Sequence, residues 1–136
     1  MKKLPAEVVL FTDGASRGNP GPAAMGAVIL STDGKVLLEI KKKLGNQTNN
    51  FAEYTALLEG LLAAAEGGAK RVTVKADSQF MIRQMLGEYR VKAEGIIPLY
   101  KQCQKVVPLF DRVDFIHVPR EENKEADRLA NEALDG

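Results

Sequence analysis

Four acidic side chains stand where a folded chain could bring them together: Asp13, Glu53, Asp77 and Asp127. Asp13 and Asp77 each follow a β-rich run and precede a small residue. Ligands of α/β proteins bind at such strand ends, where the strand order reverses. Glu53 and Asp127 fall in the first turns of two predicted helices, and each adjoins an apolar stripe. An acid at the border of a buried face needs a partner or a metal ion.

Each of these acids also has a purely structural explanation. Asp-Gly and Asp-Ser pairs are common turn formers, and the helix dipole favours a carboxylate in a first turn. The combination is more specific, because four converging carboxylates would repel one another without cations. Mg²⁺ takes its oxygen ligands from a few carboxylates and from substrate phosphate. Two such ions about 3.5–4 Å apart can activate a water and stabilise the leaving oxygen of a phosphodiester.

Hydrophobic periodicity predicts the elements that must position these acids. The predicted strands are residues 6–12, 24–31, 35–42, 71–76 and 113–118. The predicted helices run from about residue 51 to 66, from about 80 to 86, from 96 to 107 and from a cap at Asn123 through Ala133. Asn50 and Asn123 are the expected N-caps. This order of elements predicts an α/β fold in which a mixed sheet, opened by an antiparallel meander, carries helices on both faces.

The bulk properties favour one domain over residues 1–136. A net charge of +1 indicates nothing for or against a nucleic-acid partner. Cys103 is the only cysteine, so no internal disulfide can form, and its apolar surroundings predict a buried thiol. The N-terminal apolar run is too short for a signal peptide, and no stretch approaches ~18 apolar residues. We therefore expect a cytoplasmic protein without a membrane segment.

Short amides accompany the acids in the predicted loops, namely Asn19, Asn49, Asn50 and Gln79. Such amides can bond sugar hydroxyls and base edges, or they can serve as turn and cap residues. The glycines after Asp13 lack Gly-x-Gly-x-x-Gly spacing, which argues against dinucleotide binding. A Gly-rich turn beside an acidic site could instead let a nucleic-acid backbone approach closely.

Taken in order, the motifs of this chain resemble those of ribonuclease H type 1. They are Thr12–Pro22 with Met25–Ala27, Thr48–Tyr54, Ala76–Gln79 and Asn123–Ala130. The resemblance runs from about residue 7 to residue 134, and four motifs at domain-compatible spacing make a chance match very improbable.

The resemblance implies that the catalytic metal ligands are Asp13, Glu53, Asp77 and Asp127. It implies a ribonuclease H-like fold with a five-stranded sheet of order 3-2-1-4-5. The cofactor would be Mg²⁺, two ions when substrate is bound, with Mn²⁺ as an alternative. The reaction would be endonucleolytic hydrolysis of the RNA strand of an RNA–DNA hybrid, which leaves 5′-phosphate and 3′-hydroxyl ends.

The resemblance also implies a set of substrate-binding residues. Asn19, Asn50 and Gln79 match family positions that read the minor groove and its 2′-hydroxyl groups, by which a protein distinguishes RNA from DNA. Thr48 matches a position that helps to hold a phosphate of the DNA strand. We place Gly14 with them, because it belongs to the Gly-rich turn. The expected partner is a hybrid duplex, bound by a monomer.

Two departures from the family pattern indicate a compact member. Many members carry a histidine in a Gly-rich loop before the last aspartate. Here His117 closes the predicted fifth strand, so we interpret the loop as shortened and that histidine as absent. Arg120 is the candidate that partly replaces it electrostatically, and His117 is the rival. The segment 87–95 has no tryptophan and few basic residues, so we expect no basic protrusion.

Three alternatives stay open at this point. The same fold could act on double-stranded RNA or on RNA–DNA junctions. It could be a non-catalytic nucleic-acid-binding domain, although none of the four acids is missing. It could be an exonuclease of the same superfamily, against which the motifs around Asn49 and Asp77 argue.

Overall fold

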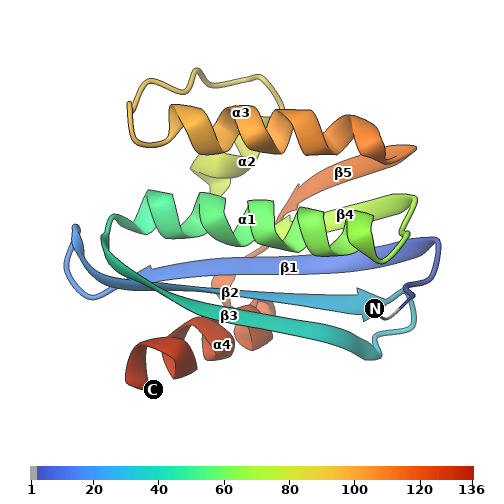
Figure 1. The fold of residues 1–136 in the computed structure, drawn as a ribbon, viewed down its shortest axis with the longest axis horizontal. Coiled ribbons are helices and arrows are strands. Elements are labelled where there is room, and N and C mark those ends of the chain that lie inside the picture. The colour runs from blue at the N-terminus through green and yellow to red at the C-terminus, as the bar shows by residue number, and fades with distance from the viewer. Residues whose placement is uncertain (1–2) are drawn as a thin grey trace.

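One mixed sheet organises the computed structural model, which describes residues 3–136 (Figure 1). Its strands are β1 (Glu7–Ser16), β2 (Gly21–Ser31), β3 (Val36–Gln47), β4 (Arg71–Ala76) and β5 (Arg112–His117). The order across the sheet is β3-β2-β1-β4-β5. β2 pairs antiparallel with both β1 and β3, whereas β4 pairs parallel with β1 and β5. The predicted order 3-2-1-4-5 and the opening meander are therefore confirmed.

Helices cover both faces of this sheet, as predicted (Figure 1). They are α1 (Asn49–Glu66), α2 (Gln79–Met85), α3 (Ile97–Val106) and α4 (Lys124–Asp135), with short 3₁₀ turns at Val107–Leu109 and Arg120–Glu122. α1, α2 and α3 lie on one side of the sheet, and α4 lies on the other. Tyr54, Leu57 and Leu61 of α1 are fully buried against the centre of the sheet. Within residues 3–136, no helix has both the length and the apolar character that crossing a bilayer requires.

The centre of the sheet is buried on both sides, because β1 and β2 lie between α1 and α4. Seven consecutive residues of β2, Ala23–Ile29, are buried, whereas both outer strands are largely exposed. Cys103 of α3 lies in the core, as predicted. Burial raises the pKa of its thiol to about 12, so it stays protonated and is not a nucleophile.

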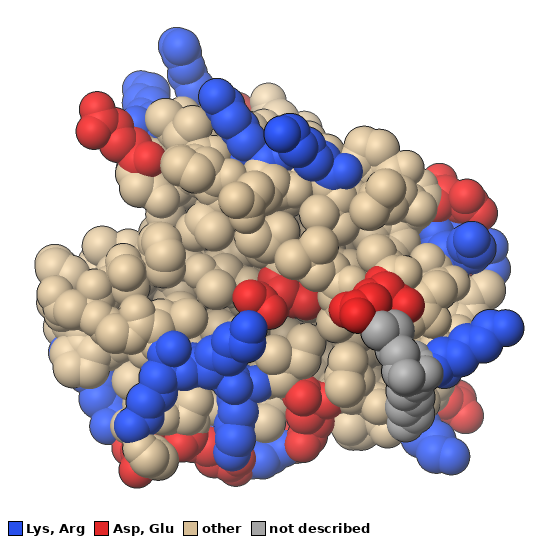
Figure 2. All heavy atoms as spheres, in the orientation of Figure 1, with Lys and Arg blue, Asp and Glu red and all other residues tan. Residues whose placement is uncertain are grey.

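The exposed edge strand β3 is covered by charges of both signs. Figure 2 shows basic and acidic side chains interspersed over the face of the molecule that carries β3. Lys41 pairs with Glu132 of α4, and Lys42 pairs with Glu59 of α1. Such charges discourage a second chain from pairing with the edge. Paired in this way, they do not form a purely basic surface.

The structure moves one predicted strand end. We predicted that the first strand stops before Asp13, but β1 continues to Ser16, so this prediction was wrong. The last residues of β1, Asp13 to Ser16, pair with Ala23–Gly26 of β2, and the Arg17 amide donates to the Pro22 carbonyl to close the turn at 2.8 Å. Asp13 therefore lies inside a paired strand, which restricts its backbone more than a loop would.

Of the two predicted N-caps, Asn50 was wrong, whereas Asn123 does hold the N-cap position of α4, although without a capping side-chain bond. α1 begins before Asn50, and the hydroxyl of Thr48 caps it by accepting a hydrogen bond from the Phe51 amide. Glu53 consequently lies beyond the first turn of α1, and that first turn contains no acidic residue. The side chain of Asn123 makes no cap to α4 and instead donates from Nδ2 to the Thr12 carbonyl at 2.9 Å.

Backbone contact sets the distance between α4 and the sheet. Gly26 of β2 pairs with Asp13 of β1 and faces α4. A Cβ atom added at Gly26 would lie 2.3 Å from the Ala126 carbonyl oxygen and 2.7 Å from the Ala130 amide. Main-chain atoms cannot move aside as a flexible side chain can, so this position requires glycine.

We therefore expect Gly26→Ala to lower the free energy of unfolding by about 2–3 kcal/mol, because the added methyl group forces α4 away from the sheet. Urea-induced unfolding measures this loss. Gly95→Ala is the matched control, because a Cβ at Gly95 meets nothing within 4 Å, and it should change stability by less than about 0.5 kcal/mol. Equal effects of the two substitutions would contradict the packing argument.

Candidate functional site

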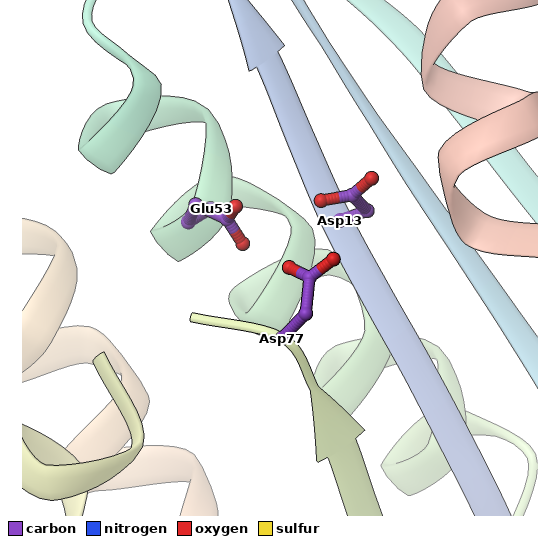
Figure 3. A group of neighbouring side chains, drawn as sticks. All are labelled: Asp13, Glu53 and Asp77. Atoms are coloured by element: carbon purple, nitrogen blue, oxygen red, sulfur yellow. The ribbon is translucent and has the colours of Figure 1, made fainter. Parts of the chain in front are cut away.

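Three of the predicted acids point toward one another at one end of the sheet (Figure 3). Asp13 lies on β1, Glu53 on α1 and Asp77 directly after β4. One carboxylate oxygen from each lies within 4.8 Å of the others. Oxygen atoms grouped at this spacing can ligate a hard divalent cation together.

Parallel pairing brings Asp77 beside Asp13. Thr12 of β1 is the register partner of Ala76, the last residue of β4. The next residues of the two strands are therefore Asp13 and Asp77. Asp77 follows the end of its strand, as predicted, whereas Asp13 does not.

A glycine brings Glu53 to the same place. A Cβ added at Gly14 would lie 2.4 Å from the Glu53 amide nitrogen and 2.7 Å from the Ala52 Cβ. The missing side chain lets the second turn of α1 rest directly on β1. We predicted that Gly14 serves close approach of a nucleic acid; in the structure the element that approaches it closely is α1.

Asp127, the fourth predicted acid, reaches the site from the other face of the sheet. It lies in the first turn of α4 and lines one cavity of about 500 Å³ together with Asp13, Glu53 and Asp77. Asn131, one turn later, donates from Nδ2 to the Asp127 carbonyl at 2.9 Å and to its Oδ1 at 3.3 Å. The four acids thus surround one cavity, although Asp127 does not belong to the tight group of three.

Crowding changes how these acids ionise. Burial raises the pKa of Asp13 to about 8, and the neighbouring charges of Asp77 and Asp127 add to this rise. The pKa of Glu53 is also well above its usual range, mainly because of burial and then because of Asp13 and Asp77. Oε2 of Glu53 is buried without a hydrogen-bond partner among the described residues. A cation would neutralise this group and give that oxygen a partner, so these residues fit a divalent metal ion.

Arg120 and His117, the two candidates to replace the family's loop histidine, differ in their position relative to the cavity. Arg120 lines the cavity, and its Nη2 lies 4.0 Å from Oδ1 of Asp127, although its side chain is 81% exposed. His117 is the last residue of β5, is exposed and does not belong to the cavity lining. The geometry therefore favours Arg120 over His117 as the group near Asp127.

The predicted substrate-binding residues form two kinds of contact. Asn19 accepts from the Asn49 amide at 3.0 Å, and Thr48 caps α1, so both hold the loops around the site in place. Asn50 is half-buried and lines a neighbouring groove beside α2, whereas Gln79, the first residue of α2, is exposed.

Five residues of the cavity wall were not predicted from the sequence: Ala15, Ser16, Arg17, Asn131 and Leu134. The spacing of four between Asp127 and Asn131 places them on one helix face, so that signal was available. Arg17 gave no signal, because its position depends on how the turn after β1 folds.

A family model described as "Reverse transcriptase-like" matches residues 11–133. A protein named Ribonuclease H from Hydrogenovibrio crunogenus is 34% identical, over 95% of this chain and 96% of its own length. The chain belongs to the ribonuclease H family.

Two solved structures of the family extend the comparison. The N-terminal RNase H domain of Rv2228c from Mycobacterium tuberculosis is 45% identical with a TM-score of 0.93, covering 96% of this chain and 95% of that chain. LC11-RNase H1, solved in complex with an RNA/DNA hybrid, is 38% identical with a TM-score of 0.89, covering 94% and 96%. The chain spans about a third of the length of the full Rv2228c protein, 36%.

Because the carboxylates of the site repel one another, removing one of their charges should stabilise the metal-free protein. Over about pH 4 to 8, the unfolded chain has lost the Asp13 proton that the folded chain keeps, because the folded pKa is raised to about 8. The free energy of unfolding of the metal-free protein should therefore fall as the pH rises through this range. We expect Asp13→Asn to remove much of this fall and to be more stable at pH 8 by about 1–3 kcal/mol.

Thermal or urea unfolding in a chelator, at pH 5 and pH 8, measures the difference. Asp114→Asn is the matched control, because Asp114 is a half-buried acid outside the site that pairs with Arg112, and we expect it to gain nothing. A destabilised Asp13→Asn protein at pH 8 would contradict the account of the site as a cluster of repelling acids.

Proposed function

We propose that this chain is an active ribonuclease H that hydrolyses the RNA strand of RNA–DNA hybrids and leaves 5′-phosphate and 3′-hydroxyl ends. The observation that carries the proposal is the convergence of four acids from two strands and two helices around one cavity. The hybrid bound to the related LC11-RNase H1 supports the choice of substrate. We further propose that residues 1–136 act as one nuclease domain and as a monomer; the cytoplasmic location stays a prediction.

In this proposal Asp13, Glu53, Asp77 and Asp127 hold two divalent ions, Mg²⁺ or alternatively Mn²⁺. Such ions would supply an activated water and stabilise the leaving oxygen of the phosphodiester. The protein itself holds the four carboxylates in position before the ions bind. Asn131 orients Asp127 through its carbonyl and carboxylate oxygens, and the packing of α1 on Gly14 fixes Glu53.

Arg120 would add a permanent positive charge beside these four acids. Arginine cannot act as a base at neutral pH, so its contribution would be electrostatic. A guanidinium near Asp127 can stabilise negative charge that develops on the phosphate during hydrolysis. The exposure of its side chain leaves it able to move toward the substrate.

The choice of RNA over DNA would fall to the amides near the start of α1 and α2. The wide, shallow minor groove of a hybrid displays its 2′-hydroxyl groups to such side chains. Asn50 and Gln79 are available for this contact, and so is the Nδ2 amide of Asn19, whose Oδ1 already accepts from Asn49. Thr48 uses its oxygen to cap α1, which leaves its hydroxyl hydrogen for a phosphate of the DNA strand.

Asp77→Asn should reduce metal-dependent cleavage of a labelled RNA–DNA hybrid by at least roughly 10³-fold, because it removes a charged ligand from the tight group of three. Asp114→Asn, which changes an acid of β5 outside the cavity lining, should leave cleavage unchanged. Wild type without hybrid cleavage, or an active Asp77→Asn variant, would refute the proposal. Side-by-side cleavage of double-stranded RNA tests whether that duplex is the better substrate.

Arg120→Ala should lower the turnover number by roughly 10²-fold, because a charge aimed at the reacting phosphate is lost. His117→Ala should have little effect, because His117 lies outside the cavity lining. Steady-state kinetics on the same hybrid measure both. A fully active Arg120→Ala protein, or an inactive His117→Ala protein, would reverse the assignment.

A further inference from the structure

One wall of the acidic cavity carries an arginine to which no role has yet been given. Arg17 follows β1 directly and lines the cavity together with the four acids. Among the described residues of the lining, only Arg17 and Arg120 are cationic. Arg120 comes from the turn before α4 and Arg17 from the turn between β1 and β2, so the two cations approach the acids from different segments.

The backbone around Arg17 is anchored to its neighbours. The Ser16 hydroxyl lies within hydrogen-bond distance of the Gly18 carbonyl in the turn and of the Gln47 carbonyl, 2.8 Å away at the end of β3. Asn19 accepts from the Asn49 amide, which ties the same turn to the start of α1. The Arg17 backbone therefore has a fixed place at the cavity wall, while its long side chain can still change direction.

The guanidinium of Arg17 is held by a carboxylate at the rim. Its Nη2 lies 2.5 Å from Oδ1 of Asp135, the last residue of α4. Both side chains are more than half exposed, 53% for Arg17 and 64% for Asp135. An ion pair between exposed groups is screened by water and contributes little stability, so a competing anion can replace the carboxylate easily.

A phosphate of the substrate is the anion that fits this exchange. The strand that presents its phosphodiester to the four acids must run along the cavity wall, and Arg17 stands on that wall. The planar guanidinium binds phosphate through two parallel hydrogen bonds, as it binds a carboxylate. The present pair has one contact, from Nη2 to Oδ1 of Asp135, so a phosphate could replace it with two bonds and without a new backbone arrangement.

We infer that Arg17 is a substrate-binding residue that exchanges Asp135 for a phosphate of the RNA strand, and that Asp135 acts as an internal competitor which lowers affinity. The inference rests on the proposed function, since it takes a hybrid as the ligand. Arg17 then contributes to affinity and to the salt dependence of binding, and hardly to the rate of the chemical step.

The test measures binding of a labelled RNA–DNA hybrid by fluorescence anisotropy in Mg²⁺, on the Asp77→Asn background to prevent cleavage. We expect Arg17→Ala to weaken binding roughly tenfold and to reduce the slope of log K against log salt concentration by about 0.7–0.9, the contribution of one phosphate contact. Arg17→Lys should keep the slope and lose part of the affinity, because lysine keeps the charge without the planar fork.

Asp135→Asn should strengthen hybrid binding, whereas Arg17→Ala should weaken it. This difference distinguishes a phosphate-binding role of Arg17 from a purely structural role of the ion pair. Freed from its competitor, Arg17 should bind the hybrid several-fold more tightly at low salt. Arg112→Ala is the matched control, because Arg112 forms a similar exposed pair with Asp114 at the far end of the parallel strands, and it should change neither affinity nor slope.

Two results would overturn the inference. In the first, Arg17→Ala changes neither affinity nor slope. In the second, Arg17→Ala and Asp135→Asn weaken binding alike, which would mean that the pair only stabilises the end of α4. Failure of the proposed function is distinguishable from both, because it would appear as an absence of hybrid cleavage by the wild-type protein.

Discussion

Mutual repulsion of buried carboxylates is the constraint on which the rest of this structure depends. Asp13 and Glu53 are buried close to Asp77, and their raised pKa values express the cost of holding them there without a cation. The fold opposes this repulsion with backbone packing. α1 rests on Gly14 and α4 on Gly26, so neither helix can shift by a side-chain rearrangement. Cations would therefore meet ligands that are already assembled, which is the condition for electrostatic preorganisation.

The hairpin of β1 and β2 positions the elements that carry the four acids. Asp13 and Gly26 are register partners, so the acid and the contact with α4 belong to one pair of residues. The Thr12 carbonyl, one residue before Asp13, accepts from Asn123 at the start of α4. Asp77 is added by parallel pairing of β4 with β1. Since α1, which carries Glu53, rests on Gly14 of the same strand, all four acids take their places from a few residues of β1.

Local patterns predicted the elements well where periodicity was strong and failed where a distant partner decides. The alternation of Val72 and Val74 gave β4 its observed bounds. The end of β1 was predicted wrongly because Gly14 resembles the start of a turn. In the structure, pairing with the small residues of β2 extends the strand. Such tertiary pairing overrides local β-propensity. Asn123 holds its predicted N-cap position, but its side chain does not cap the helix, because the acceptor that it binds, the Thr12 carbonyl, lies 111 residues away in the sequence. The family resemblance, rather than periodicity, supplied the set of four acids and the strand order.

The structural contacts of Asn19 and Thr48 do not exclude the substrate roles that the family resemblance implies. A side-chain amide offers an acceptor oxygen and two donor hydrogens, and a hydroxyl can accept and donate at once. Asn19 uses its oxygen for the Asn49 amide, and Thr48 uses its oxygen for the Phe51 amide. In both residues the donor function is left for another partner. Since phosphate oxygens and 2′-hydroxyl oxygens both accept hydrogen bonds, the internal contact orients each side chain for the bond that a hybrid would complete.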